Sequence, residues 1–228
     1  MPNVGQRKVH AKSWGFGLTS FLCVGVAGYA IWAYGGGVQR VPVHPDMAAA
    51  FDAHRTLITT HAVAASVALL LGPTQFVDAW RARSPRAHRI AGYLYLVLGV
   101  GVGGVAGVLL APHSFGGFVS HLGFGMLGCL WLFTGVMAFS SARNRRFEAH
   151  RTWMIRNFAL SLAAVTLRIY LPVSAVAGIP FEQFYPAIPW FCWVPNLIVA
   201  ECCRKKPNQP PEPTPGSVTP RATEAVVE

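Results

Sequence analysis

Charged residues are scarce in this sequence. Asp, Glu, Lys and Arg make up 12% of the 228 residues, whereas roughly 25% is usual in a soluble domain. So few charges cannot cover the surface of a water-soluble protein of this length. The scarcity excludes an ordinary soluble domain, and the 53% of hydrophobic residues points to an integral membrane protein.

Acidic residues are the scarcer kind, with 9 against 19 basic residues and a net charge of +10. A strongly basic chain can indicate nucleic-acid binding. Here, however, the basic residues cluster in short segments between apolar blocks, which is the arrangement that membrane topology requires. We therefore expect the lipid bilayer, and no nucleic acid, as the partner of these charges.

Cysteine motifs are also lacking. The five cysteines form neither a CxxC nor a CxxCH pattern, which argues against a cysteine zinc site and against covalently attached haem c. Cys23, Cys129 and Cys192 fall inside the apolar blocks described next, where a free thiol usually behaves as a small apolar residue.

Long apolar blocks are what the sequence has in place of charge. A helix that crosses a bilayer needs about 20 mainly apolar residues. The segments that meet this requirement are 15–36, 55–77, 89–111, 118–140, 152–173 and 185–203. We predict an all-α membrane domain over residues 1–203, with six transmembrane helices and a four-helix core made of the second to fifth. The first block resembles a signal peptide, but it is too long and lacks a clear cleavage site, so we expect it to be retained.

The basic clusters set the orientation. They lie before the first block, between the second and third, between the fourth and fifth, and after the last: 7–12, 81–89, 143–151 and 204–206. The alternate connections are nearly free of Lys and Arg, so the positive-inside rule predicts that both termini are cytoplasmic. We expect a multi-pass protein of the bacterial cytoplasmic membrane, with a disordered, Pro-rich cytoplasmic tail over 204–228.

A glycine motif lies inside the third block. Gly99, Gly101 and Gly104 match the GxGxxG pattern, but no strand precedes them and no helix begins after them, so a nucleotide-binding site is excluded. Gly99, Gly103 and Gly107 recur every four residues, which predicts a face for close packing against a neighbouring helix.

Histidines lie at the edges of these blocks, three of them in the repeated tripeptide AHR. The predicted orientation places His61 and His121 in the outer half of the second and fourth helices, and His88 and His150 at the inner edge of the third and fifth. His54 lies directly before the second helix, at its outer end. Two histidines from facing helices are the usual axial ligands of haem b. The pattern therefore suggests two sites for haem iron, formed by His61 with His121 and by His88 with His150.

Three arginines extend this hypothesis. Arg89 and Arg151 follow the inner histidines directly and would balance haem propionates on the inner side. Arg168 lies in the outer third of the fifth block, where it would either extend to the outer surface or face an anionic group such as a propionate.

The histidine pattern leaves several functions open. Bound haem would make the protein a carrier of electrons across the membrane or to quinone, or a component of a membrane oxidoreductase with a redox partner. Without haem, His61 and Arg168 would line a route for protons or a small solute. In a scaffold protein, the histidines would only anchor helix ends at the membrane interface. No residue is assigned a catalytic role.

Five segments resemble a bacterial membrane protein family known as domain of unknown function 2306. They are LLLGPTQF (69–76), HRIAGYLYL (88–96), LWLFTGVMAF (130–139), HRTWMIRNFALSLAAVTLRIYLP (150–172) and WVPNLIVAE (193–201). The resemblance covers about residues 54–201 and implies membrane location and fold, without an activity. The residues that it marks are His61, Gln75, His88, Arg89, Gly92, Tyr95, Trp131, His150, Trp153, Met154, Arg156, Arg168, Pro195, Asn196 and Glu201.

A looser resemblance concerns the arrangement of the histidines alone. Six-helix cytochromes that pass electrons from ascorbate across membranes also use histidines on alternate helices of a four-helix core, with one haem on each side. The pairing expected here is similar to theirs in layout, and layout by itself does not establish function.

Overall fold

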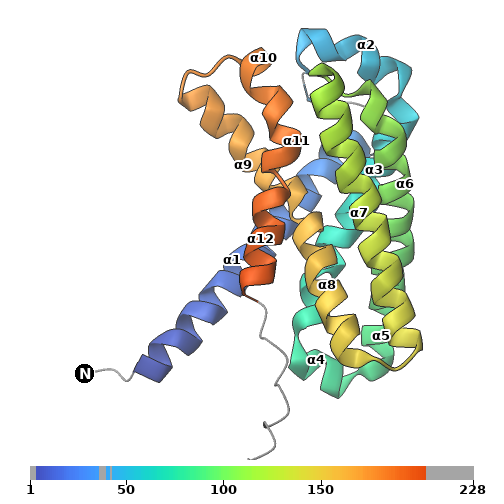
Figure 1. The fold of residues 1–228 in the computed structure, drawn as a ribbon, viewed down its shortest axis with the longest axis vertical. Helices are drawn as coiled ribbons and strands as arrows, with labels where there is room; N and C mark the ends of the chain where they lie inside the picture. Colours follow the sequence, from blue (N-terminus) through green and yellow to red (C-terminus); the bar gives the residue numbers. More distant parts are fainter. Residues whose placement is uncertain (1–3, 36–39, 42, 204–228) are drawn as a thin grey trace, which may run out of the picture.

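Helices account for every regular element in the part of the chain that the structure describes. A computed structural model describes residues 4–35, 40–41 and 43–203, and these residues contain no strand (Figure 1). The predicted all-α fold is therefore confirmed. The predicted disordered tail, 204–228, lies outside the described residues.

Five helical segments are long and apolar enough to cross a membrane, and they match the first five predicted blocks. Several of them are divided into consecutive helices. The bounds are α1 Val4–Tyr34, α3 Arg55–Leu71 with η2 Pro73–Phe76, α5 Pro85–Leu94 with η3 Tyr95–Val102 and α6 Gly103–Leu110, α7 Gly117–Arg143, and α8 Phe147–Ser161 with α9 Ala163–Val176.

The sixth predicted block is broken into short helices. They are α10 Phe181–Phe184, η5 Tyr185–Ala187, α11 Ile188–Phe191 and α12 Val194–Cys202. Proline occurs at the start of η5, α11 and α12, because proline lacks the backbone N–H that an interior helical position needs. In the break before α12, Asn196 Nδ2 donates a hydrogen bond to the Cys192 carbonyl at 2.9 Å. A sixth crossing of the membrane stays a prediction.

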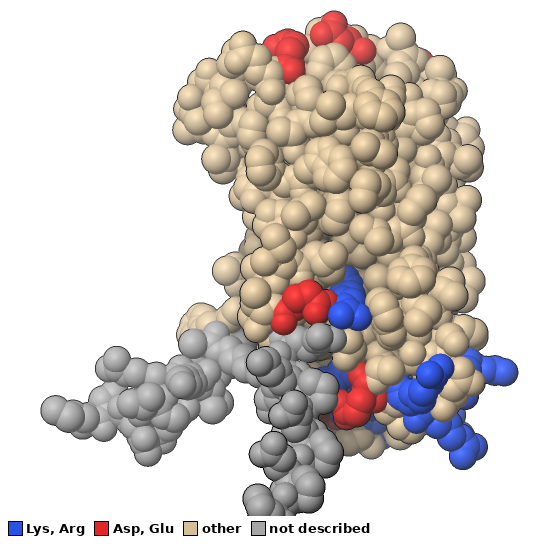
Figure 2. Space-filling view, in the orientation of Figure 1, with Lys and Arg blue, Asp and Glu red and all other residues tan. Residues whose placement is uncertain are grey.

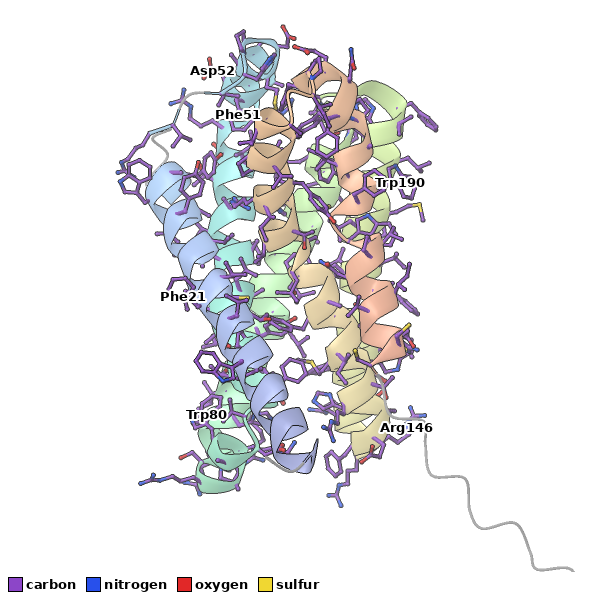
Figure 3. The ribbon with its side chains drawn as sticks, turned by 90° about the vertical axis from the view of Figure 1, so that its left-hand side faces the viewer. Phe21, Phe51, Asp52, Trp80, Arg146 and Trp190 are labelled. Atoms are coloured by element: carbon purple, nitrogen blue, oxygen red, sulfur yellow. The ribbon has the colours of Figure 1, made fainter. Side chains whose placement is uncertain are left out.

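Short helices connect the long ones at the two ends of the bundle. Helix α2 Pro45–Ala53 lies at one end, near α10, and α4 Asp78–Arg83 lies at the other (Figure 1). We call these the α2 end and the α4 end. Figure 3 places Asp52 at the α2 end, and Trp80 and Arg146 at the α4 end. On the visible face, basic side chains gather toward the α4 end (Figure 2), so the α4 end corresponds to the predicted cytoplasmic side.

Glycines bring η3 and α6 into close contact with α3. A methyl group on Gly99 would lie 2.8 Å from the Ala68 methyl, and one on Gly103 would lie 3.3 Å from the Ala65 backbone nitrogen. A methyl group on Gly107 would lie 3.1 Å from the His61 ring. The predicted packing face is therefore confirmed, with α3 as its partner.

A buried polar network joins η3, α7 and α8 near the middle of the bundle. The Tyr95 hydroxyl donates to Asn157 Oδ1 at 2.7 Å, and Asn157 Nδ2 donates to the Trp131 carbonyl and to Thr134 Oγ1, both at 2.8 Å. Ser161 Oγ lies 3.0 Å from the Tyr95 hydroxyl and accepts a hydrogen bond from Trp131 Nε1 at 2.9 Å. Buried polar groups need such partners wherever water is absent.

Replacing Asn157 tests this network. Asn157→Ala leaves partners on η3 and α7 without a hydrogen bond, so we expect the free energy of unfolding to fall by about 1–3 kcal/mol. Tryptophan fluorescence of the purified protein during denaturant-induced unfolding measures it. The control is Asn144→Ala, because Asn144 is exposed and the hydrogen bond given for its side chain is a long one, 3.5 Å to Ser140 Oγ. Equal losses in the two variants would contradict the assigned role.

Candidate ligand-binding site

A cavity of about 470 Å³ lies between the helices in the half of the bundle toward the α2 end. Its volume is within the range of small-molecule and cofactor sites, roughly 300–1,000 Å³. Most of its lining is apolar or glycine, and the polar or ionisable side chains are few. These are Asp46, His54, His61, His113, Ser114, Trp131, Ser161, Arg168, Tyr185 and Cys192.

The mouth of the cavity is at the α2 end. Helix α2 contributes Asp46 and Phe51, of which Asp46 is exposed. The rings of His54 and His113 stack there with their centroids 3.8 Å apart. His54 immediately precedes α3 and His113 ends η4 Ala111–His113, so the stack joins the second and third long segments. The sequence suggested only an interfacial role for His54, because stacking across two helices leaves no signal in the spacing of residues.

His61 projects into the cavity from α3. Its Nδ1 lies 2.8 Å from the Gly103 carbonyl oxygen. A carbonyl can only accept, so Nδ1 carries the proton of the neutral ring and Nε2 keeps a free lone pair. The lack of a side chain at Gly107 leaves space for the ring against α6. The arrangement fixes the tautomer and orientation of His61 and leaves Nε2 available to a ligand.

Arg168 brings a positive charge to the same cavity. One guanidinium nitrogen donates to the Ala164 carbonyl at 3.0 Å, and the guanidinium carbon lies 5.7 Å from the centre of the Tyr29 ring. Among the residues that the structure describes, no carboxylate forms an ion pair with Arg168. A charge inside a membrane bundle usually has a counter-charge, so the cavity favours a ligand that carries an anionic group.

Two residues of the buried polar network, Trp131 and Ser161, also line the cavity. They bond to each other, and Ser161 continues to Tyr95 and Asn157. Asn157 and Ser161 were not among the site residues predicted from the sequence. Their spacing of four residues on one helix face, inside an apolar block, is the signal that would have found them.

His121 lies beside the cavity region and not among the residues that line it. It is on the first turns of α7, and its Nε2 lies 3.0 Å from the Ser114 carbonyl oxygen. The structure therefore places His61, and not His121, on the cavity surface. Their predicted pairing across an iron atom remains untested.

His88 lies on α5 and His150 on α8, both toward the α4 end. His150 Nδ1 is 2.9 Å from the Ala138 carbonyl oxygen, whereas His88 Nδ1 is buried without a hydrogen-bond partner in the described chain. Their pairing across an iron atom stays a prediction.

The two predicted inner arginines follow these histidines at the protein surface. Arg89 and Arg151 are both exposed at the α4 end. Their role toward haem propionates stays a prediction.

A family model described as "Predicted membrane protein (DUF2306)" matches residues 58–203, which is more than half of the chain. The chain belongs to this family. No curated protein and no solved structure matches it. The expected resemblance is confirmed, and the DUF2306 region contains His61, His88, His121, His150 and Arg168. Helices α1 and α2 precede that region. Asp46, which lines the cavity, lies in α2.

Cysteine labelling tests whether the cavity opens at the α2 end. In a variant without the five native cysteines, we expect Ala65→Cys to react with a small anionic methanethiosulfonate reagent added from that side. Ala65 lines the cavity, where Arg168 attracts an anion. The control is Val63→Cys, on the same helix but exposed on its outer surface, where lipid excludes the reagent. Equal labelling at the two positions would contradict an open cavity.

Proposed function

We propose that this DUF2306 protein binds haem b inside its helical bundle and carries electrons across the membrane or to quinone. The observation that carries the proposal is the 470 Å³ cavity in which His61 presents Nε2. His88 on α5 and His150 on α8 are the predicted ligands of a second site, at the opposite end of the bundle. A bound haem b would supply one-electron transfer at each site.

The hydrogen bond of His61 supports its role as an axial ligand. Metal-bound imidazoles usually donate their other N–H to a carbonyl or carboxylate, which fixes the tautomer and raises the basicity of the ligating nitrogen. The Gly103 carbonyl fulfils this function for His61, and the Ala138 carbonyl fulfils it for His150.

The surroundings of His61 also support a ligand in the cavity. Gly104, Gly107 and Gly128 are among the residues that line it, and the lack of a side chain at Gly107 leaves space for the His61 ring. Arg168, which has no acidic partner in the described chain, would neutralise one propionate. We keep His121 as the predicted second ligand of the outer haem, and include the cavity-lining His113 in the test.

Transport of a small anionic solute is the second candidate function. The observation that favours it is the same guanidinium of Arg168, which has no acidic partner in the described chain, in a cavity that is also lined by polar and ionisable groups at the α2 end. The buried network that adjoins the cavity would then conduct protons or close the route. A transporter of this kind needs no chromophore, so colour separates the two functions.

The first experiment is a visible difference spectrum, dithionite-reduced minus oxidised, of protein purified after expression with ample haem. We expect sharp b-type bands with about two haems per chain, because the bundle offers two histidine sites. A content near one haem per chain would mean that only one of the two sites binds haem. Colourless protein would rule out the haem proposal and lead to transport assays.

Single histidine variants assign each haem. We expect His61→Ala to remove the outer haem and His88→Ala or His150→Ala to remove the inner one, each lowering haem content by about half if two are bound. His121→Ala and His113→Ala identify the second outer ligand. His44→Gln is the control, since His44 does not line the cavity. Unchanged haem content in all the test variants would overturn the assignment.

A further inference from the structure

We propose that His44, Asp46 and Glu182 form a binding site for a divalent first-row transition-metal ion, with Zn²⁺ as the representative ion. One ligand atom from each of the three side chains lies within 4.8 Å of the others. The site is at the α2 end and is separate from the four histidines of the haem proposal. It does not depend on that proposal.

The ligands come from two segments that are far apart in the chain. His44 immediately precedes α2, Asp46 lies in its first turn, and Glu182 lies in α10. The imidazole is between the two carboxylates: its Nδ1 is 3.7 Å from Asp46 Oδ2 and its Nε2 is 3.5 Å from Glu182 Oε1. A bound ion would therefore link the helix at the mouth of the cavity to the segment that follows α9.

Neither of these contacts is a hydrogen bond. An N–H···O bond joins atoms roughly 2.7–3.2 Å apart, and both distances exceed that range. His44 Nδ1 is moreover buried without a hydrogen-bond partner among the described residues. A buried nitrogen without a hydrogen bond, 3.7 Å from the Asp46 carboxylate, needs an explanation, and a bound cation provides one.

The spacing suits a metal ion. Zinc binds nitrogen and oxygen at roughly 2.0–2.2 Å, so neighbouring ligand atoms in a tetrahedral site are about 3.4 Å apart. One ion binds one imidazole nitrogen, and one ligand atom from each of the three side chains lies within 4.8 Å of the others, so rotation of the exposed carboxylates brings them to this spacing. One imidazole with two carboxylates is a donor set for zinc and its neighbours, whereas calcium and magnesium prefer oxygen alone.

Aromatic packing holds the imidazole in place. The His44 ring stacks on Phe181 with centroids 4.4 Å apart and planes 16° from parallel, and Phe115 lies on another side at 6.1 Å. Because this packing already orders the His44 ring, metal binding costs less side-chain conformational entropy.

The position of the site supports access by ions from solution. Asp46 and Glu182 are exposed, and acidic side chains appear at the α2 end in Figure 2, with no basic side chain visible beside them. His44 and Asp46 also precede the part of the chain that matches the family model, so the proposed site is not contained in the DUF2306 region.

Zinc binding to the purified full-length protein tests the proposal. We measure it by competition with a chromophoric chelator, and by the melting temperature as a function of zinc concentration. Wild type should bind one zinc ion more than Glu182→Gln, or bind it at least about tenfold more tightly, because losing a ligand costs no less than losing a second-shell partner. Zinc should raise the melting temperature of wild type more than that of the variant.

Asp52→Asn is the matched control. It removes one negative charge from the same end of the molecule, but Asp52 pairs with Arg55 and lies outside the cluster. We expect it to bind zinc as wild type does. Asp46→Asn should reproduce the loss seen in Glu182→Gln, and the melting temperatures without zinc show whether each variant is folded. Equal zinc binding by wild type, Glu182→Gln and Asp46→Asn would overturn the site.

The same variants separate this proposal from haem binding. His44→Gln should lose the zinc site and keep its haem bands, whereas His61→Ala should keep the zinc site and lose haem. Loss of both properties in His44→Gln would contradict the independence of the two sites.

Discussion

The close contact of α3 with η3 and α6 is the constraint on which the rest of the structure depends. Glycines at positions 99, 103 and 107 let the two backbones approach, and Ala65 and Ala68 are the facing residues. In lipid, helices associate through such close packing and not through the exclusion of water. The same contact places the Gly103 carbonyl against His61 and thereby orients the imidazole that enters the cavity. A side chain at Gly107 would move that ring.

Polar groups within the bundle follow from the same absence of water. Tyr95, Asn157 and Ser161 satisfy one another and form the centre of the molecule. Toward the α2 end, in contrast, His61 and Arg168 face open space. Groups of this kind are retained inside a membrane protein mainly where a ligand, an ion or a proton uses them. The contrast between a polar network that is satisfied internally and ionisable side chains that line a cavity is the physical basis for proposing a binding site in the α2 half of the bundle.

Several features were predictable because they depend on local chemistry alone. The apolar blocks gave five spanning helices close to their expected limits, since length and apolarity decide which segments can cross a bilayer. The spacing of Gly99, Gly103 and Gly107 predicted a packing face, because residues four apart share one side of a helix. The sixth block was predicted as one helix, but Pro186, Pro189 and Pro195 each lie at the second position of a new short helix, so the block is broken.

The sequence by itself determined the membrane class, the helical fold and the set of histidines and arginines available for a site. Hydropathy and charge determine these features, because each residue contributes to them regardless of its neighbours in space. Only the tertiary structure decided which of those residues meet. It placed His61 on the cavity wall with Arg168, left His121 outside the lining, stacked His54 on His113, and brought Glu182 to His44 from the far side of the sequence. Such contacts depend on the rotation of each helix about its axis and on the breaks at Leu162 and Trp193, and close packing between helices sets both.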